Sequence, residues 1–390
     1  MKRHVLIALW LLAIAPSVFG EIGGEVAFDP SDIESIALTA TGSAHFRDGE
    51  YRLSVDAFSH AIELDPSNLS AHAYLGAAHF FLEEYKLAIA VFSRGIALNP
   101  NHASLSRTMY MKRGDCYRHL GSHRHAIRDY NNVIRLDPES DVAYYHRAKA
   151  HLGLGNPRKA IRDYNRTIQL NPTQPIAYNN RAVAYYYLGN YRKAIRDCTR
   201  SIKLKLEYAE PYFNRGKSYH AIEKYRKAIK DYNRAIELNP TYLEALIYRG
   251  NAHASLEKYE EAKSDFDRVI DLDPTYAAAY RNRGFVFRKT GDIPRAIENY
   301  NDAIRINTED DEAYINRGSS YSYLEKYQQA SADFTRAIEL NPYNATAYIG
   351  RGFQYLKLNE TNLGCTDLEK GCELGNCWGI NHARKEGDCE

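Results

Sequence analysis

The chain has 390 residues, with 51 Lys and Arg against 49 Asp and Glu and with 44% hydrophobic residues. This composition is long and apolar enough to fold around a substantial core, which excludes a disordered polyampholyte. Two of the cations, Lys2 and Arg3, precede an apolar N-terminal run, so the remainder is formally neutral. That balance argues against a dedicated nucleic-acid binder, because such proteins carry a basic face.

The first twenty residues have the anatomy of a secretory signal peptide. Lys2 and Arg3 are followed by an apolar run from Val5 to Ala15 and by small residues up to Gly20. The run is too short to span a bilayer as a helix, which takes about 20 residues. We expect a signal peptide over 1–20, a leader segment over 21–34, a secreted or periplasmic location and no integral membrane span after cleavage. The alternative is a membrane tether formed by an uncleaved signal anchor.

Prolines reveal an internal repeat. The intervals Pro66–Pro100, Pro138–Pro172 and Pro240–Pro274 are all 34 residues. A fixed period of this size is typical of stacked supersecondary units. It predicts ten units, at 35–68, 69–102, 107–140, 141–174, 175–208, 209–242, 243–276, 277–310, 311–344 and 345–378. A Cys-containing tail follows at 379–390.

Each unit is predicted to be a helical hairpin. In 209–242, apolar and small residues recur at helical spacing in two stretches separated by a polar break, and the second stretch ends at Asn239-Pro240. The pattern Tyr212, Gly216, Tyr219, Ala228, Tyr232, Ala235 and Pro240 resembles the tetratricopeptide repeat. The resemblance implies an all-α, right-handed superhelical solenoid of antiparallel hairpins. It also implies a concave channel, lined by the first helices, that holds peptides or partner proteins.

An Arg and an acid vary together along the repeat. Seven units, such as those with Arg147 and Asp163 or Arg317 and Asp333, have Arg at the seventh position and Asp at the twenty-third. The unit of Arg283 has Asn299 in the acid's place, and the first two units lack both members. This covariation indicates a pair that braces the hairpin rather than a row of ligand sites.

The candidate ligand contacts are residues at the channel positions that the family resemblance implies, together with several tyrosines that the packing pattern does not require. Asn amides can bind an extended backbone by donating and accepting at once, aromatic rings supply contact area, and Lys or Arg select acidic groups. The set therefore predicts an extended, partly acidic peptide as ligand. Its members are Tyr145, Lys149, Asn180, Tyr186, Tyr187, Phe213, Asn214, Lys217, Tyr248, Asn251, Arg281 and Asn282.

Four of the six cysteines crowd the C-terminus, which in an exported chain indicates disulfides. On one continuous helix Cys365 and Cys372 lie about 10 Å apart along the axis, too far for a bridge. We favour Cys372–Cys377 with Cys365–Cys389, and the crossed pairing remains open. A zinc site is the alternative, although the spacings are unlike those of usual zinc ligands. Cys116 and Cys198 fall at packing positions and are expected to be buried thiols.

No catalytic, cofactor or metal motif stands out, and acids recur with the repeat instead of converging once. We therefore expect a non-enzymatic scaffold, exported from the cytoplasm, that binds a protein or peptide and nucleates a complex. The alternative is a structural solenoid that oligomerises through the apolar first units, which present Phe80 and Phe81.

Overall fold

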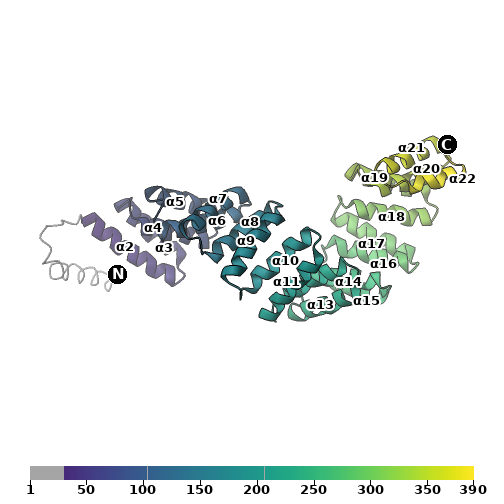
Figure 1. Ribbon diagram of the computed structural model, residues 1–390. Helices are drawn as coiled ribbons and strands as arrows, with labels where there is room; N and C mark the ends of the chain where they lie inside the picture. The colour runs from purple at the N-terminus through teal and green to yellow at the C-terminus, as the bar shows by residue number, and fades with distance from the viewer. Residues whose placement is uncertain (1–29, 103, 206) are drawn as a thin grey trace. The chain divides into compact units, whose positions relative to one another are not determined.

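The computed structural model describes residues 30–102, 104–205 and 207–390. The predicted signal peptide over 1–20 lies outside these ranges. Every regular element within them is an α-helix (Figure 1). The chain divides into two compact units, Met1–Leu204 and Lys205–Glu390, and each is described by itself.

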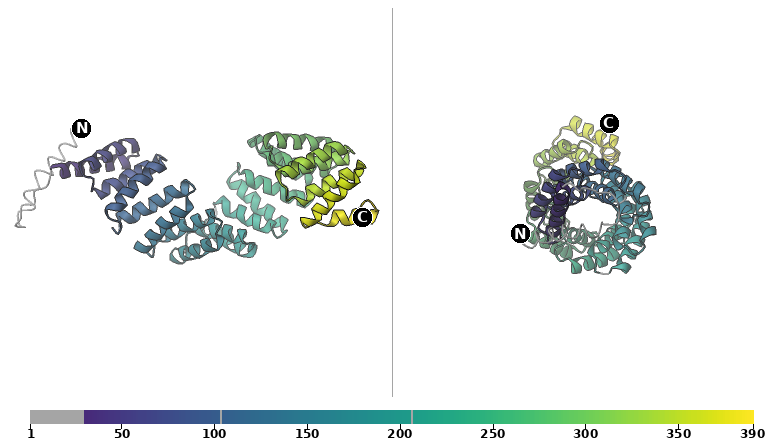
Figure 2. Two further views of the ribbon diagram at one scale, coloured as in Figure 1. Left: turned by 90° about the horizontal axis from the view of Figure 1, so that it is seen from above. Right: turned by 90° about the vertical axis from the view of Figure 1, so that its left-hand side faces the viewer.

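The first unit consists of antiparallel helix pairs in chain order, and the views of Figure 2 show the same pairing from other sides. Its helices are α2 (Pro30–Arg47), α3 (Tyr51–Leu64), α4 (Leu69–Phe81), α5 (Tyr85–Leu98), α6 (Leu105–His119), α7 (His123–Leu136), α8 (Asp141–Gly153), α9 (Pro157–Leu170), α10 (Pro175–Tyr187) and α11 (Tyr191–Leu204).

The second unit continues the pattern and ends with an extra helix. Its members are α12 (Ala209–His220), α13 (Tyr225–Leu238), α14 (Leu243–Ser255), α15 (Tyr259–Leu272), α16 (Ala277–Lys289), α17 (Ile293–Ile306), α18 (Asp311–Tyr323), α19 (Tyr327–Leu340), α20 (Ala345–Lys357), α21 (Thr361–Glu373) and α22 (Trp378–Glu386).

Both units have the all-α hairpin architecture that the sequence predicts. At the two ends the structure adds detail. Helix α2 begins at Pro30, inside the segment expected to be a leader, and α22 occupies most of the expected tail.

An aromatic ring on the second helix of a hairpin packs directly on the backbone of the first. Tyr232 of α13 is fully buried against Gly216 of α12, and a Cβ added at Gly216 would lie 2.5 Å from the Tyr232 ring. The same relationship joins Phe266 to Gly250, at 2.6 Å. These close approaches explain why the repeat keeps a small residue and an aromatic residue sixteen positions apart.

The Arg–Asp pairs predicted to brace the hairpins are confirmed. Arg147 Nε and Nη2 donate to the Asp163 carboxylate at 2.8 and 2.6 Å, and Asp163 is buried. Arg283 donates to Asn299 at 2.8 Å where the acid is replaced. Bidentate geometry of this kind both neutralises a buried carboxylate and fixes the hairpin's register.

The structure also shows a third bond of these arginines that the sequence analysis missed. Arg147 Nη1 donates at 2.7 Å to Asn131 Oδ1 on α7, in the preceding hairpin. Arg249 reaches Asn233 at 2.8 Å, and Arg317 reaches Asn301 at 2.7 Å. All three acceptors occupy the twenty-fifth position of their unit, so the column of Asn residues was the available signal.

The C-terminal hairpin is closed by α22. Ile380 and Ala383 of α22 are buried against Leu368 of α21 and Ile349 of α20. The structure pairs Cys365 with Cys389 and Cys372 with Cys377, at Cα–Cα distances of 5.7 and 3.9 Å.

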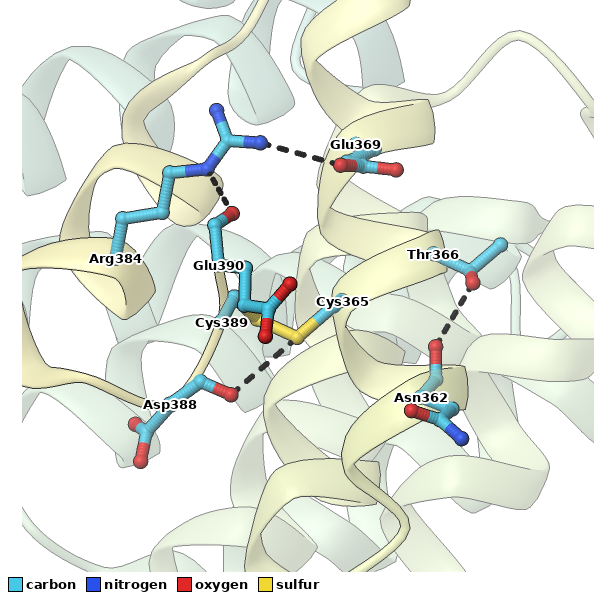
Figure 3. The surroundings of a disulfide bond; sticks show 8 residues. All are labelled: Asn362, Cys365, Thr366, Glu369, Arg384, Asp388, Cys389 and Glu390. Atoms are coloured by element: carbon cyan, nitrogen blue, oxygen red, sulfur yellow. Dashed lines mark hydrogen bonds and ion pairs between the residues drawn. A yellow bond between two sulfur atoms is a disulfide. The ribbon is translucent and has the colours of Figure 1, made fainter.

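Figure 3 shows the Cys365–Cys389 pair beside Arg384, which donates to the Glu390 carbonyl at 2.6 Å and to Glu369 at 3.2 Å. Cys116 and Cys198 are buried and belong to neither of these two pairs, as predicted. From Pro30 onward, none of the helices described combines the length and the apolar character needed to cross a membrane.

Candidate binding surface on the first helices

The first unit brings together three of the predicted ligand-binding residues. Asn180 Nδ2 on α10 donates to the Tyr145 hydroxyl on α8 at 3.0 Å. Lys149 Nζ, one turn further along α8, lies 5.7 Å from the centre of the Tyr145 ring. Burial, followed by the charge of Arg118, lowers the pKa of Lys149. An amide, a phenol and an ammonium group thus share one surface across two successive first helices.

A buried carboxylate that the sequence analysis missed lies on α6, the preceding first helix. Asp115 of α6 is buried, accepts from the Tyr130 hydroxyl at 2.8 Å and lies 2.7 Å from His146 Nδ1 on α8. Burial alone would raise the pKa of Asp115, but His146 and Tyr130 outweigh it and lower that pKa. The carboxylate therefore contacts α8 through His146, three residues before Lys149.

The two tyrosines predicted at the end of α10 form a contact of their own. The rings of Tyr186 and Tyr187 are 6.3 Å apart, and Tyr186 also packs on Tyr191 at 5.3 Å. Tyr187 is 71% exposed. Its ring is therefore open to a ligand, whereas Tyr186 also serves the hairpin.

The second unit has a corresponding cluster on α12 and α14. Lys217 Nζ lies 5.5 Å from the centre of the Phe213 ring and 5.2 Å from that of Tyr248, and the two rings are 5.5 Å apart. Phe213 is buried and forms the base of the cluster, while Asn214 beside it is half-buried. Burial lowers the pKa of Lys217.

A groove follows between α14, α15 and α16. Its volume is about 380 Å³. Asn251 and Asn282 meet at its wall, where Asn282 Nδ2 donates to Asn251 Oδ1 at 3.0 Å. The groove is also lined by Ser255, Glu257, Phe266, Phe285 and Lys289. Glu257 in the turn and Phe266 on α15 were missed because channel positions counted on first helices alone leave out the turn and the second helix.

Arg281 differs from the other predicted residues, because its charge is already balanced inside the chain. Its Nη1 donates to both carboxylate oxygens of Asp310, at 2.7 and 2.8 Å, and lies 3.2 Å from Glu312. An arginine held this way positions α18 against α16 and has little left for an anionic ligand.

Nothing in the described ranges assembles a metal site from three or more His, Cys, Asp or Glu side chains. The polar groups of both clusters are spread along successive helices instead of converging on one point. Such an arrangement can bind an extended ligand through amides, rings and ammonium groups.

Family models match much of the chain. A tetratricopeptide repeat model matches 142–174, 175–208, 209–242 and 311–344. A TPR repeat model matches 114–155, 250–291 and 286–323, and a further tetratricopeptide repeat model matches 39–103. No curated protein sequence matches the chain.

Several solved structures are similar. A tetratricopeptide repeat protein from Parabacteroides merdae ATCC 43184 is 18% identical over 65% of this chain and 99% of its own, with a TM-score of 0.52. A chain of the APC/C hetero-tetramer Cut9-Hcn1 is 12% identical over 96% of this chain and 98% of its own, with a TM-score of 0.50. The MamA protein is 27% identical over 44% of this chain and 94% of its own, with a TM-score of 0.40.

At these identities the first two likenesses show the fold alone, an all-α superhelical repeat. The family models rest on the sequence, and they fall on the same hairpins whose Gly–aromatic packing and Arg–Asp pairs are described above. The chain belongs to the tetratricopeptide repeat family.

Proposed function

We propose that the protein is an exported, non-enzymatic scaffold that binds an extended, partly acidic peptide or the matching segment of a partner protein on its first helices. The groove of the second unit carries the proposal. Asn251 and Asn282 place two amides on one wall of a 380 Å³ space, and Phe285 supplies apolar area. Amides that both donate and accept suit a peptide backbone.

Charge near the groove and in the first unit adds selectivity. Lys217 and Lys149 are partly desolvated ammonium groups held over aromatic rings. A carboxylate of the ligand would offset the desolvation of each of these ammonium groups. Arg281 is left out of this set because Asp310 already neutralises it.

Export is proposed from the N-terminal leader and from the cysteines. The two cysteine pairs of the C-terminal hairpin lie at bonding distance, as an oxidising compartment allows. We propose that both are disulfides in the mature protein.

Site-specific photo-crosslinking in the native host tests the binding surface. A photoreactive residue in place of Ser255, which lines the groove and is exposed, should capture a discrete partner. The matched control has the same residue in place of Arg268, which is exposed on α15. Capture from both positions alike, or from neither, would contradict a ligand in the groove.

Removing two of the side chains named above should abolish binding. Lys217→Ala with Asn251→Ala should abolish the cross-link from position 255 while leaving helical circular dichroism unchanged. An undiminished cross-link would remove these two residues from the binding surface.

Self-assembly is a second candidate, favoured by an apolar surface at the start of the first unit. Phe81 is 47% exposed and stacks on Tyr51 at 5.0 Å, and Leu53 and Leu87 are about half exposed. Exposed apolar area of this kind is typical of contact surfaces. Light scattering that grows with concentration, and stops growing with Phe81→Glu, would favour assembly; a monodisperse monomer would exclude it.

A further inference from the structure

The small formal net charge of the chain, +2, conceals a strongly basic region. Helices α7, α9 and α11 of the first unit together carry twelve Lys and Arg residues against three Asp. All three are second helices of consecutive hairpins. The acidic residues that balance these cations therefore lie elsewhere in the chain.

The three Asp residues do not offset this charge at the surface. Asp129, Asp163 and Asp197 are buried. Each is bound by the Arg at the seventh position of its own unit, at N–O distances of 2.7, 2.6 and 2.7 Å. Because those arginines come from the first helices, the cations of the second helices remain uncompensated.

The surface cations form rows. The eighteenth and twenty-second positions of three consecutive units are all Arg, and all six are exposed: Arg124, Arg128, Arg158, Arg162, Arg192 and Arg196. Within the described part of the chain, none of the six makes a hydrogen bond or an ion pair. Residues four apart on a helix project from the same side, about 6 Å apart. Each helix therefore contributes one row to a common face.

The hairpin itself does not require cations there. In the second unit, the same two positions of α15 are Glu260 and Ser264, and that hairpin has the same Gly–aromatic packing. The rows on α7, α9 and α11 are thus a property of this surface and not of the fold.

The face is hollowed at the start of α9. A shallow depression of about 490 Å³ is lined by Arg158, Lys159 and Arg162 and by the turn residues Gly155 and Asn156. It combines three cations with the N-terminal end of a 14-residue helix. Cations and a helix N-terminus both favour an anionic group, of which a phosphate is the typical example.

We propose that this basic face docks the protein on an anionic phospholipid surface. Guanidinium groups match phosphate oxygens in a bidentate manner, and Arg supplies all three rows. No Tyr, Phe, Trp, Leu or Ile of the three helices is exposed, which fits electrostatic docking without insertion. Without exposed rings for base stacking, the face is less suited to single-stranded nucleic acid.

The choice of a membrane as the anionic partner rests on the export proposed above, because an exported protein encounters phospholipid headgroups before and after it crosses a membrane. The face is separate from the first-helix clusters, so a membrane-docked chain keeps Lys149 and Asn180 available to a ligand.

Vesicle co-sedimentation of the full chain tests the proposal. We expect binding to phosphatidylcholine vesicles that contain phosphatidylglycerol, loss of that binding at high salt, and little binding to phosphatidylcholine alone. Arg158→Gln, Lys159→Gln and Arg162→Gln together should weaken partitioning by about 100-fold, at roughly a factor of five for each cation.

The matched control removes the same charge from the second unit. Arg295→Gln, Arg305→Gln and Arg336→Gln change exposed cations of α17 and α19 and should leave partitioning within about 3-fold of the unmodified chain. All variants share one N-terminus, so the leader cannot produce a difference between them.

Three outcomes would overturn the inference: equal binding of the α9 variant, equal binding to neutral vesicles, or binding to duplex DNA without binding to anionic vesicles. Failure here is distinguishable from failure of the proposed scaffold. The α9 variant should still cross-link a partner from position 255, and the Lys217→Ala, Asn251→Ala variant should still bind vesicles.

Discussion

Arg147 and Asp163 join the two helices of one hairpin by two parallel hydrogen bonds, at 2.8 and 2.6 Å, with the carboxylate buried. Removing the cation leaves a buried charge without its partner, which costs more than the pair contributes. We expect Arg147→Met to lower the free energy of unfolding by about 3–5 kcal/mol. Urea denaturation followed by circular dichroism measures it.

Two controls separate the parts of this interaction. Asn131→Ala removes only the third bond of Arg147, and should cost about 1 kcal/mol. The double variant Arg147→Met, Asp163→Leu should be more stable than Arg147→Met alone, because no charge is left buried. A double variant that is less stable than Arg147→Met alone would show that the unpaired carboxylate is not the source of the loss.

A second prediction concerns the turns inside the hairpins. Glu257 has φ of 59°, a left-handed conformation in which side chains are strained, whereas Gly155 and Gly189 occupy the equivalent place in other hairpins. Glu257→Gly should therefore stabilise the chain by about 0.5 kcal/mol, since relief of strain outweighs the extra entropy of unfolded glycine. Thermal unfolding would show a small rise in Tm.

The reverse substitution provides the test of sign. Gly189→Glu places a side chain in a left-handed turn with φ of 71° and open space around it. It should destabilise the chain by a similar amount. A gain in stability from Gly189→Glu would show that backbone strain does not govern these turns.

A third prediction addresses the oxidation state of the cysteines. The protein purified from its host without reductant should show two thiols after denaturation, those of Cys116 and Cys198, and six after reduction. Burial raises the pKa of Cys116 to about 12, so its thiol should react slowly in the folded state. Mass spectrometry after alkylation gives both counts; six thiols without reductant would contradict the proposed disulfides.

The fourth prediction follows from His220 on α12. Burial lowers the pKa of His220 below its ordinary value of 6.5. The unfolded chain therefore binds a proton at a pH where the folded chain does not, and stability falls as the pH drops through 6.5 toward the folded pKa. The contribution of neutral His220 to the stability of the fold is fully present above pH 6.5.

His220→Phe keeps an aromatic ring beside Tyr225 and Tyr248 and removes the titration. Urea denaturation at about pH 7.5 and about pH 5.5 should show a smaller loss of stability for this variant than for the unmodified chain. An identical loss in both would assign the acid sensitivity to other groups.

Much of the fold could be predicted because it repeats. One hairpin packs by contacts such as that of Gly216 with Tyr232, and the residue pattern behind such contacts recurs along the chain with a fixed period. The covariation of Arg and Asp was visible for the same reason. Helix α22 has no counterpart in the repeat, and its docking depends on Ile380 meeting Leu368, which periodicity does not reveal.

The sequence indicated which residues of the binding surface lie on the same side of the hairpins, but not all the contacts that they make. Asn180 contacts Tyr145 and Asn282 contacts Asn251, because the residues of each pair lie on successive first helices. The engagement of Arg281 by Asp310 was not foreseeable, since it depends on the next hairpin's first turn. The basic rows were overlooked because total charge was summed over the chain and not over one side of it.

The third bond of arginines such as Arg147 has a consequence for how the first unit comes apart. It ties a hairpin to its predecessor, starting with Arg113, which donates to Ser93 on α5 at 2.8 Å. The hairpin before that, α2–α3, has Thr41 in place of the arginine, and α4 has Leu75. Opening should therefore begin at α2–α3 and pause at the first tied hairpin, so amide exchange should rise in a step toward the N-terminus and not as a gradient.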